Sequence, residues 1–235
     1  LLIKDIETIN RKIEKAEKEA KGGGKQEKEN LEILIRLNEH CNDGSKARNF
    51  HVNPEQERFL SQLHLLTQKP ILYVANVDEN EIMSNEKSPL TVELFKFAEK
   101  EQNIAIRLCG KLEQDLSILG PAEQAEFIKE YNLPGIGLNK LIKASYDLLE
   151  LETFFTGGPN EVRAWTIKHG TLAPSAAGEI HTDFEKGFIK AEVYHYNDII
   201  EFLSESELRD AGKIRLEGRN YIVKDGDIIY FKFNV

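Results

Sequence analysis

Cysteine is scarce in this sequence, which has two in 235 residues, Cys41 and Cys109. Two cysteines so far apart give no disulfide framework and no metal-ligand spacing. They fit a reducing cytoplasm, where each is expected to be a small buried apolar residue. No apolar run approaches the roughly 20 residues that cross a bilayer, and the amino terminus has no signal-peptide pattern. We therefore expect a cytoplasmic protein with neither a metal site nor a membrane partner.

Positive charge is in deficit, with 31 Lys and Arg against 40 Asp and Glu, a formal net charge of −9. This balance argues against a globally basic nucleic-acid binder, and we expect no DNA partner. A local basic face remains possible, because phosphate binding depends on where the charges lie. Apolar residues make up 40% and charged residues 30%. That composition is typical of a globular chain of one large domain or two ordinary ones.

A phosphate-binding Gly-x-x-x-x-Gly-Lys-Ser/Thr loop is also missing from the sequence. The segment Gly22-Gly23-Gly24-Lys25 is not such a loop, because no apolar strand precedes it and no Ser or Thr follows the lysine. The glycines instead separate two predicted helices. The first has Leu, Ile and Ala at heptad spacing from Leu2 to Ala20, and the second runs from about Gln26 to Cys41, with Leu31, Leu34, Ile35 and Leu37 on its apolar side. The pattern predicts an antiparallel coiled-coil hairpin.

The most informative segment is KPILYVANVDE at residues 69–79. Pro70 followed by five apolar residues predicts a strand buried on both faces of a parallel sheet. Asn76-Val77-Asp78-Glu79 then lies at the carboxyl edge, where open α/β sheets bind ligands. In GTPases this edge carries Asn-Lys-x-Asp, which reads guanine. The change of the last Asp to Glu79 suggests ATP in place of GTP, although the tetrapeptide alone fits a simple turn better.

A predicted helix precedes this strand, and a second helix and strand follow it. Asn53-Pro54 begins a helix that is expected to bury Phe59, Leu60, Leu63 and Leu66 before the first strand. A helix at residues 89–100, with Leu90, Leu94, Phe97 and Ala98 inward, then leads to a strand at residues 104–108. This order predicts a parallel crossover. The loop Cys109-Gly110-Lys111 after it is expected to place backbone N–H groups against a base, and helices at residues 121–130 and 137–149 follow.

From about residue 152 the period changes to short β-type runs separated by turns. Strands are predicted at residues 153–156, 162–167, 188–193, 214–216, 221–223 and 228–233, with a helix at about residues 171–181. Five or six strands with one crossing helix suit a β-grasp, ubiquitin-like domain.

Three segments give the chain a resemblance to the Obg-like ATPases, called YchF in bacteria. They are residues 69–79, FTGGPNEVRAWTI at residues 155–167 and AAGEIHTDFEKGFI at residues 176–189. The resemblance implies a coiled-coil insertion at residues 1–69, the rest of an α/β nucleotide-binding domain at residues 70–149, and a TGS domain at residues 150–235. It also implies a base site formed by Asn76, Val77, Glu79, Cys109, Gly110 and Lys111.

The departure from the family pattern is the absence of the phosphate loop and of the switch segments, which the resemblance places upstream of Leu1. Those elements bind the phosphates and Mg²⁺. We therefore expect the complete protein to be a ribosome-associated ATPase that uses ATP, or GTP, with Mg²⁺ as a translation-related or stress-related switch. The chain as printed is expected to be inactive and monomeric, with no catalytic residue and no Mg²⁺ ligand. The alternative is a non-catalytic adaptor that docks on ribosome, RNA or protein.

Two sets of lysines are the candidate partner surface for ribosome or structured RNA. They are Lys12, Lys15 and Lys18 on the hairpin and Lys168, Lys186 and Lys190 near the carboxyl end. Solvated helix faces often carry such charges without any partner. His181 and Asp183 would share one face of a strand, as a metal or acid–base pair would, but no third ligand follows at a recognised spacing, so a structural role is favoured.

Overall fold

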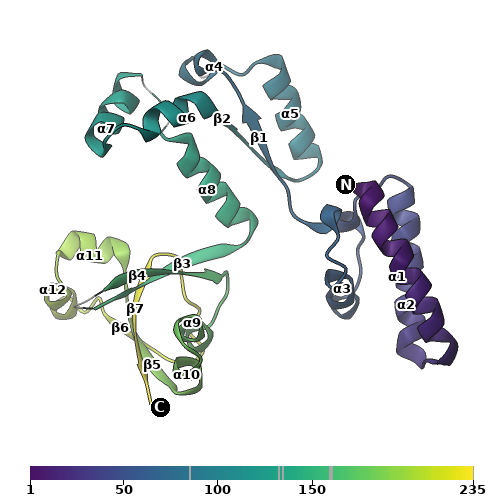
Figure 1. Ribbon diagram of the computed structural model, residues 1–235. Coiled ribbons are helices and arrows are strands. Elements are labelled where there is room, and N and C mark those ends of the chain that lie inside the picture. Colours follow the sequence, from purple (N-terminus) through teal and green to yellow (C-terminus); the bar gives the residue numbers. More distant parts are fainter. Residues whose placement is uncertain (85, 132, 134, 159–160, 235) are drawn as a thin grey trace. The chain divides into compact units, whose positions relative to one another are not determined.

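A computed structural model describes residues 1–84, 86–131, 133, 135–158 and 161–234 (Figure 1). It combines helices with two β-sheets, which confirms the predicted α/β class. The chain divides into two compact units, Leu1–Ile71 and Leu72–Val235. The predicted domain limits at residues 69 and 149 stay predictions. Within the described residues, no helix is both long enough and apolar enough to cross a bilayer.

The first unit is built on a pair of packed helices. Its elements are α1 (Leu2–Gly22), α2 (Lys25–Asn42), the short 3₁₀ turns η1 (Ala47–Asn49) and η2 (Leu66–Gln68), and α3 (Pro54–Ser61). The glycines end α1 where the sequence predicts, and Ile9 of α1 is fully buried against α2. On α2 the prediction of an inward Ile35 is wrong: Ile35 is 41% exposed, and Ile33 is buried in its place. Leu34 and Leu37 are buried as predicted.

The helix predicted from Asn53 is confirmed at its start. The Asn53 side chain accepts a hydrogen bond from the Gln56 amide, and the Gln56 side-chain oxygen accepts one from the Asn53 amide, a capping box. The helix ends at Ser61, however, so Leu63 lies beyond it, and Leu66 is 39% exposed rather than buried. The backbone of the segment that follows α3 is hydrogen-bonded to a carboxylate of α1. Asp5 of α1, itself buried, accepts hydrogen bonds from the amides at residues 66 and 67.

The second unit begins with a parallel pair of strands, β1 (Leu72–Asn76) and β2 (Ile104–Leu108), joined by α4 (Glu79–Met83) and α5 (Pro89–Lys100). The parallel crossover is thus confirmed. Helices α6 (Gly110–Ser117), α7 (Pro121–Glu130) and α8 (Gly137–Leu148) follow.

The prediction that the first strand is buried on both faces is wrong. Val74 is 41% exposed, because β1 pairs only with β2 within the described part of the chain. On α5, Ala98 is buried, whereas Leu90 and Phe97, predicted to face inward, are exposed. The apolar runs therefore predict where these elements lie, but they overestimate how many of the apolar side chains are buried.

The rest of the second unit is a five-stranded sheet with helices. Its strands are β3 (Leu151–Gly157), β4 (Val162–Lys168), β5 (Phe188–His195), β6 (Arg215–Glu217) and β7 (Asp227–Phe233), in the order β4-β3-β7-β5-β6. Strands β3 and β7 are parallel, and the other neighbours are antiparallel. The helices are α9 (Ala173–Ile180), α10 (Thr182–Lys186), α11 (Tyr196–Phe202) and α12 (Glu205–Asp210).

Most of the predicted elements of this region are present, with two differences. Residues 221–223 form no strand, since they contribute only an isolated bridge between Ile222 and Leu172. Helices α10, α11 and α12 are short and were not predicted. Pro159 and Asn160, which belong to the second resemblance segment, lie outside the described residues.

One face of this sheet carries the core, which includes Phe154, Ala176, Val193 and Ile229. A buried carboxylate lies at the start of β7: Asp227 accepts hydrogen bonds from the Tyr221 hydroxyl at 2.7 Å and the Lys224 amide at 2.9 Å. Burial, together with the bond to Asp227, raises the pKa of Tyr221 to about 12.

Candidate nucleotide-base edge

The carboxyl ends of β1 and β2 meet at one edge, as the prediction requires. Asn76 and Leu108 are register partners, and the Val77 amide donates to the Leu108 carbonyl at 2.9 Å, which extends the pairing one residue further. The two connections that leave these strands therefore start side by side.

Asn76 links the two connections. Its Oδ1 accepts a hydrogen bond from the Gly110 amide at 3.0 Å. Since an amide N–H can only donate, the oxygen of the Asn76 side chain must face Gly110, and the Nδ2 donors remain for another partner. A Cβ at residue 110 would lie 3.4 Å from Asn76 Oδ1, so glycine lets the backbone approach this side chain. Gly110 is the first residue of α6, so the predicted base-binding loop is the amino end of a helix.

A second link joins Glu79 and Lys111. The Lys111 Nζ lies 2.8 Å from Glu79 Oε1, with side chains 74% and 36% exposed, respectively. The hydrogen bond and the charge of Glu79 raise the pKa of Lys111. Lys111 and Glu79 thus place an ammonium and a carboxylate together beside the strand ends, a position we call the rim of the edge. Both are among the residues that the sequence assigns to base binding.

The remaining predicted site residues contribute backbone rather than side chains. Cys109 is buried, so its thiol is not presented to a ligand, and its carbonyl accepts from the Glu113 amide in the first turn of α6. The Val77 amide is already used in the strand pairing. The first amides of α6 follow Gly110 directly, and helix amino ends suit acceptor groups.

Arg107 of β2 binds backbone carbonyls near this edge, and this role was not predicted from the sequence. Its Nη1 donates to the carbonyls of Glu81 and Glu86, at 3.1 Å and 2.6 Å, which links α4 and Glu86 to β2. A hydrogen bond from Thr91, with further help from Ser88 and the charge of Arg107, lowers the pKa of Glu81. The available signal was the charge of Arg107 inside an otherwise apolar strand.

Glu113 caps α8, and this role was not predicted from the sequence either. Its two carboxylate oxygens accept from the amides of Gly137 and Leu138, at 2.7 Å and 3.0 Å, and so cap α8. A Cβ at residue 137 would lie 2.6 Å from Glu113 Oε1, so only glycine fits there without movement. The capping of α8 thus depends on a residue in the first turn of α6.

Comparisons with known proteins show which proteins this chain is similar to. Residues 151–234 match the family YchF-GTPase_C, described as a protein of unknown function (DUF933). The whole chain is 43% identical to the Ribosome-binding ATPase YchF of Bacillus subtilis (strain 168) over 235 residues, and 43% identical to the Obg-like ATPase 1 of Gallus gallus over 239 residues. The chain is a homologue of the YchF and Obg-like ATPases. The resemblance seen in the sequence is confirmed.

A solved structure agrees. The structure of the Schizosaccharomyces pombe YchF GTPase aligns over 98% of this chain with a TM-score of 0.84 and 32% sequence identity. The chain spans 64% of the length of the Bacillus subtilis relative, 60% of the Gallus gallus relative and 63% of the Schizosaccharomyces pombe chain. The fold and the homology to these proteins are thus shown, whereas activity, ligands and partners of the whole protein are matters of proposal.

The Mg²⁺ that the resemblance implies has no set of ligands in the described part of the chain. Among the described residues, no three His, Cys, Asp or Glu side chains lie together in a way that could hold a metal ion. Asp78, the acidic residue nearest to Asn76 in sequence, instead caps α4 by accepting from the Glu81 amide at 2.8 Å. No chemical step through a metal is therefore assigned to these residues.

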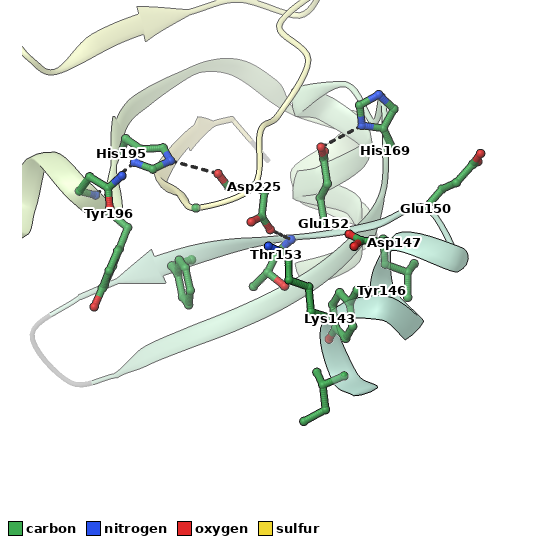
Figure 2. Close-up of a pocket in the computed structure, with 15 residues that line it drawn as sticks. Lys143, Tyr146, Asp147, Glu150, Glu152, Thr153, His169, His195, Tyr196 and Asp225 are labelled. Atoms are coloured by element: carbon green, nitrogen blue, oxygen red, sulfur yellow. Dashed lines mark hydrogen bonds and ion pairs between the residues drawn. The ribbon is translucent and has the colours of Figure 1, made fainter. Parts of the chain in front are cut away.

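A separate pocket of about 1000 Å³ lies where α8 meets the five-stranded sheet (Figure 2). Its polar groups pair with one another: His169 Nδ1 lies 2.8 Å from Glu152 Oε1, and Asp225 Oδ1 accepts from the Thr153 amide. His195 Nε2 lies 3.1 Å from the Asp225 carbonyl. None of the predicted base-site residues lines this pocket. Sequence patterns did not indicate it, because its lining comes from segments far apart in the chain.

The predicted His181–Asp183 pair does not lie on a strand, so the shared strand face was wrong. His181 precedes α10, and its Nδ1 accepts from the Asp183 amide at 3.2 Å. Its ring therefore caps a short helix, which gives it the structural role that the sequence favoured.

The two sets of lysines differ in arrangement. Lys12, Lys15 and Lys18 are exposed along α1, three residues apart. Lys168 is on β4 and Lys190 on β5, with β3 and β7 between them, and Lys186 ends α10. At the usual strand spacing of about 4.8 Å, strands β4 and β5 are roughly 14 Å apart. The Lys168 ammonium also donates to the Leu149 carbonyl at 2.7 Å. The structure thus brings the first set together and leaves the second scattered.

Proposed function

We propose that this chain forms the base-recognition edge and the partner-binding parts of a ribosome-associated, ATP-preferring nucleotide hydrolase. The observation that supports this most directly is the pair of contacts across the two strand ends, Asn76 with Gly110 and Glu79 with Lys111. The names of the relatives, a ribosome-binding ATPase and an Obg-like ATPase, agree with it.

Base binding on this proposal uses donors that the structure leaves available. The Asn76 Nδ2 donates to N7 of a purine, which is an acceptor in both adenine and guanine. The choice between the two bases then depends on the rim, where Glu79 replaces the Asp that accepts the guanine donors. In the complete protein, ATP, or less favourably GTP, binds here together with Mg²⁺, and the phosphates are bound by segments outside this chain.

The other parts are proposed as partner surfaces of a cytoplasmic switch in translation or stress. The α1–α2 hairpin is the coiled-coil insertion, and its packed helices support that assignment. The five-stranded sheet is a β-grasp TGS domain, an assignment supported by the parallel pairing of its first and last strands in the middle of the sheet. The exposed Lys12, Lys15 and Lys18 keep a second candidate open, an adaptor that docks on ribosome or structured RNA without catalysis.

Calorimetric titration of a complete protein carrying this segment tests the base assignment. Changing Glu79→Asp together with Val77→Lys restores the guanine-reading pattern. It should weaken ATP relative to GTP by about 1–3 kcal/mol, the usual value of a base-edge contact. An unchanged ratio of ATP to GTP affinity would refute the role of these residues, and binding of neither nucleotide would favour the adaptor.

A further inference from the structure

The ion pair between Glu79 and Lys111 has a consequence for base choice. The two residues lie on different connections, Glu79 at the start of α4 and Lys111 in the first turn of α6, and their charged atoms are 2.8 Å apart. Asn76 and Gly110 hold the same two connections together beside them. The pair therefore sits next to the proposed anchor for the purine ring.

Lys111 binds the Glu79 carboxylate, which is the acceptor that guanine needs. Guanine presents two adjacent donors, N1–H and the 2-amino group, which a free carboxylate accepts together. A carboxylate that already binds an ammonium must give up that partner, or share it, to accept both. Adenine has a lone pair at N1 and a C–H at position 2, so it does not compete for the carboxylate. The ammonium also masks the negative charge of Glu79 from the N1 lone pair.

We infer that Lys111 is a specificity-determining residue of this edge: by holding Glu79, it lowers the affinity for guanine nucleotides relative to adenine nucleotides. The inference rests on the proposed base site. It also explains how a carboxylate can stand at the rim without selecting guanine, which the change from Asp to Glu alone does not explain.

The surroundings of Lys111 set the size of the effect. Asp115, one turn further along α6, is a second carboxylate that attracts the ammonium. Both partners of the ion pair are partly or largely exposed, and exposed pairs are weak and screened by salt. We therefore expect removal of Lys111 to change the ratio of guanine to adenine affinity by roughly two- to fivefold, rather than by orders of magnitude.

The test uses the 235-residue chain, labelled with ¹⁵N, and titrations with AMP and GMP followed at the amide signals of Asn76 and Gly110. Lys111→Met should raise GMP affinity relative to AMP, and Lys111→Arg, which keeps the charge, should retain the wild-type ratio. Lys129→Met, an exposed change on α7, is the matched control. In high salt the wild-type ratio should move toward that of Lys111→Met. In a Glu79→Gln background, Lys111→Met should have no further effect on the ratio.

The outcomes separate this inference from the proposed function. If AMP and GMP both shift the Asn76 and Gly110 signals but Lys111→Met leaves their ratio unchanged, the base site stands and the role of Lys111 is refuted. An effect of equal size in the Glu79→Gln background also refutes it, because the lysine would then act without Glu79. If neither nucleotide shifts these signals, both the base site and the inference fail.

Discussion

Asp5 is expected to be the most sensitive polar residue of the first unit. Its side chain is 2% exposed, and its two carboxylate oxygens accept from the amides of Leu66 and Thr67, each at 2.7 Å. The bonds join α1 to a segment more than 60 positions later in the chain. Asp5 thereby fixes the stretch that leads toward β1.

The cost of Asp5→Ala follows from these contacts. Thr67 is buried, so its amide would lose the Asp5 carboxylate without water to replace it, whereas Leu66 is 39% exposed and can be hydrated. A buried unsatisfied donor costs about 1–3 kcal/mol, and a bond to a charged acceptor contributes about 1.5–3 kcal/mol. We expect a loss of roughly 2–4 kcal/mol in the unfolding free energy. Asp5→Asn, which keeps one acceptor oxygen, should lose about half as much.

Urea unfolding followed by circular dichroism at 222 nm measures this loss, because the first unit is mostly helical. Trp165, the one tryptophan, lies in the second unit, so its fluorescence reports that unit separately. Glu14→Ala, an exposed change on the same helix, should stay within about 0.5 kcal/mol of wild type. If Asp5→Ala also stays within that range, while amide exchange at residue 67 is unchanged, the reasoning is wrong.

Three further predictions concern activity, partners and pH. The 235-residue chain should show no ATP turnover in a phosphate-release assay at high protein concentration, since its sequence has no phosphate loop; turnover that follows the chain through repurification contradicts this. Changing Lys12, Lys15 and Lys18 to Glu should abolish salt-sensitive co-sedimentation with ribosomes without loss of helical signal; unchanged co-sedimentation would leave the hairpin a structural arm. The pKa of Glu81 is lowered from 4.5, so its carboxylate stabilises the fold at pH above 4.5, and this contribution is lost as pH falls through the folded pKa. Glu81→Gln should therefore flatten the acid side of a stability–pH curve, and an unchanged curve refutes the assignment.

The sequence predicted the meeting of the two strand ends better than it predicted burial. Asn76, Gly110 and Lys111 could be placed because strand ends and motif spacing are local signals, and parallel pairing brings such ends together. The contact of Lys111 with Glu79 could not be predicted, since it depends on side-chain reach between two connections. Val74 shows the opposite case: its apolar run signals a strand, but its exposure depends on which elements cover it.

The elements missed in the carboxyl-terminal region have a common cause. Helices α10, α11 and α12 have five to seven residues each, too short to show a helical period. Their starts depend on caps such as His181 and His195, whose ring nitrogens accept from the amide two residues later. Histidine is not among the usual capping residues, so α10 and α11 had no recognisable start signal; α12 does begin at a usual cap, Ser204, and only its shortness hid it.

The position of β7 in the sheet bears on how this protein folds during synthesis. Among the described strands, β7 comes last in chain order, yet it lies in the middle of the sheet, between β3 and β5. Until residues 227–233 have left the ribosome, β3 and β5 have no central strand to join them. The apolar side chains of both strands then lack the core contacts that β7 provides. Closure of the sheet is therefore a late, non-local event, of the kind that slows folding and leaves nascent chains open to aggregation. Loss of residues 227–233 would remove the centre of the sheet rather than its margin.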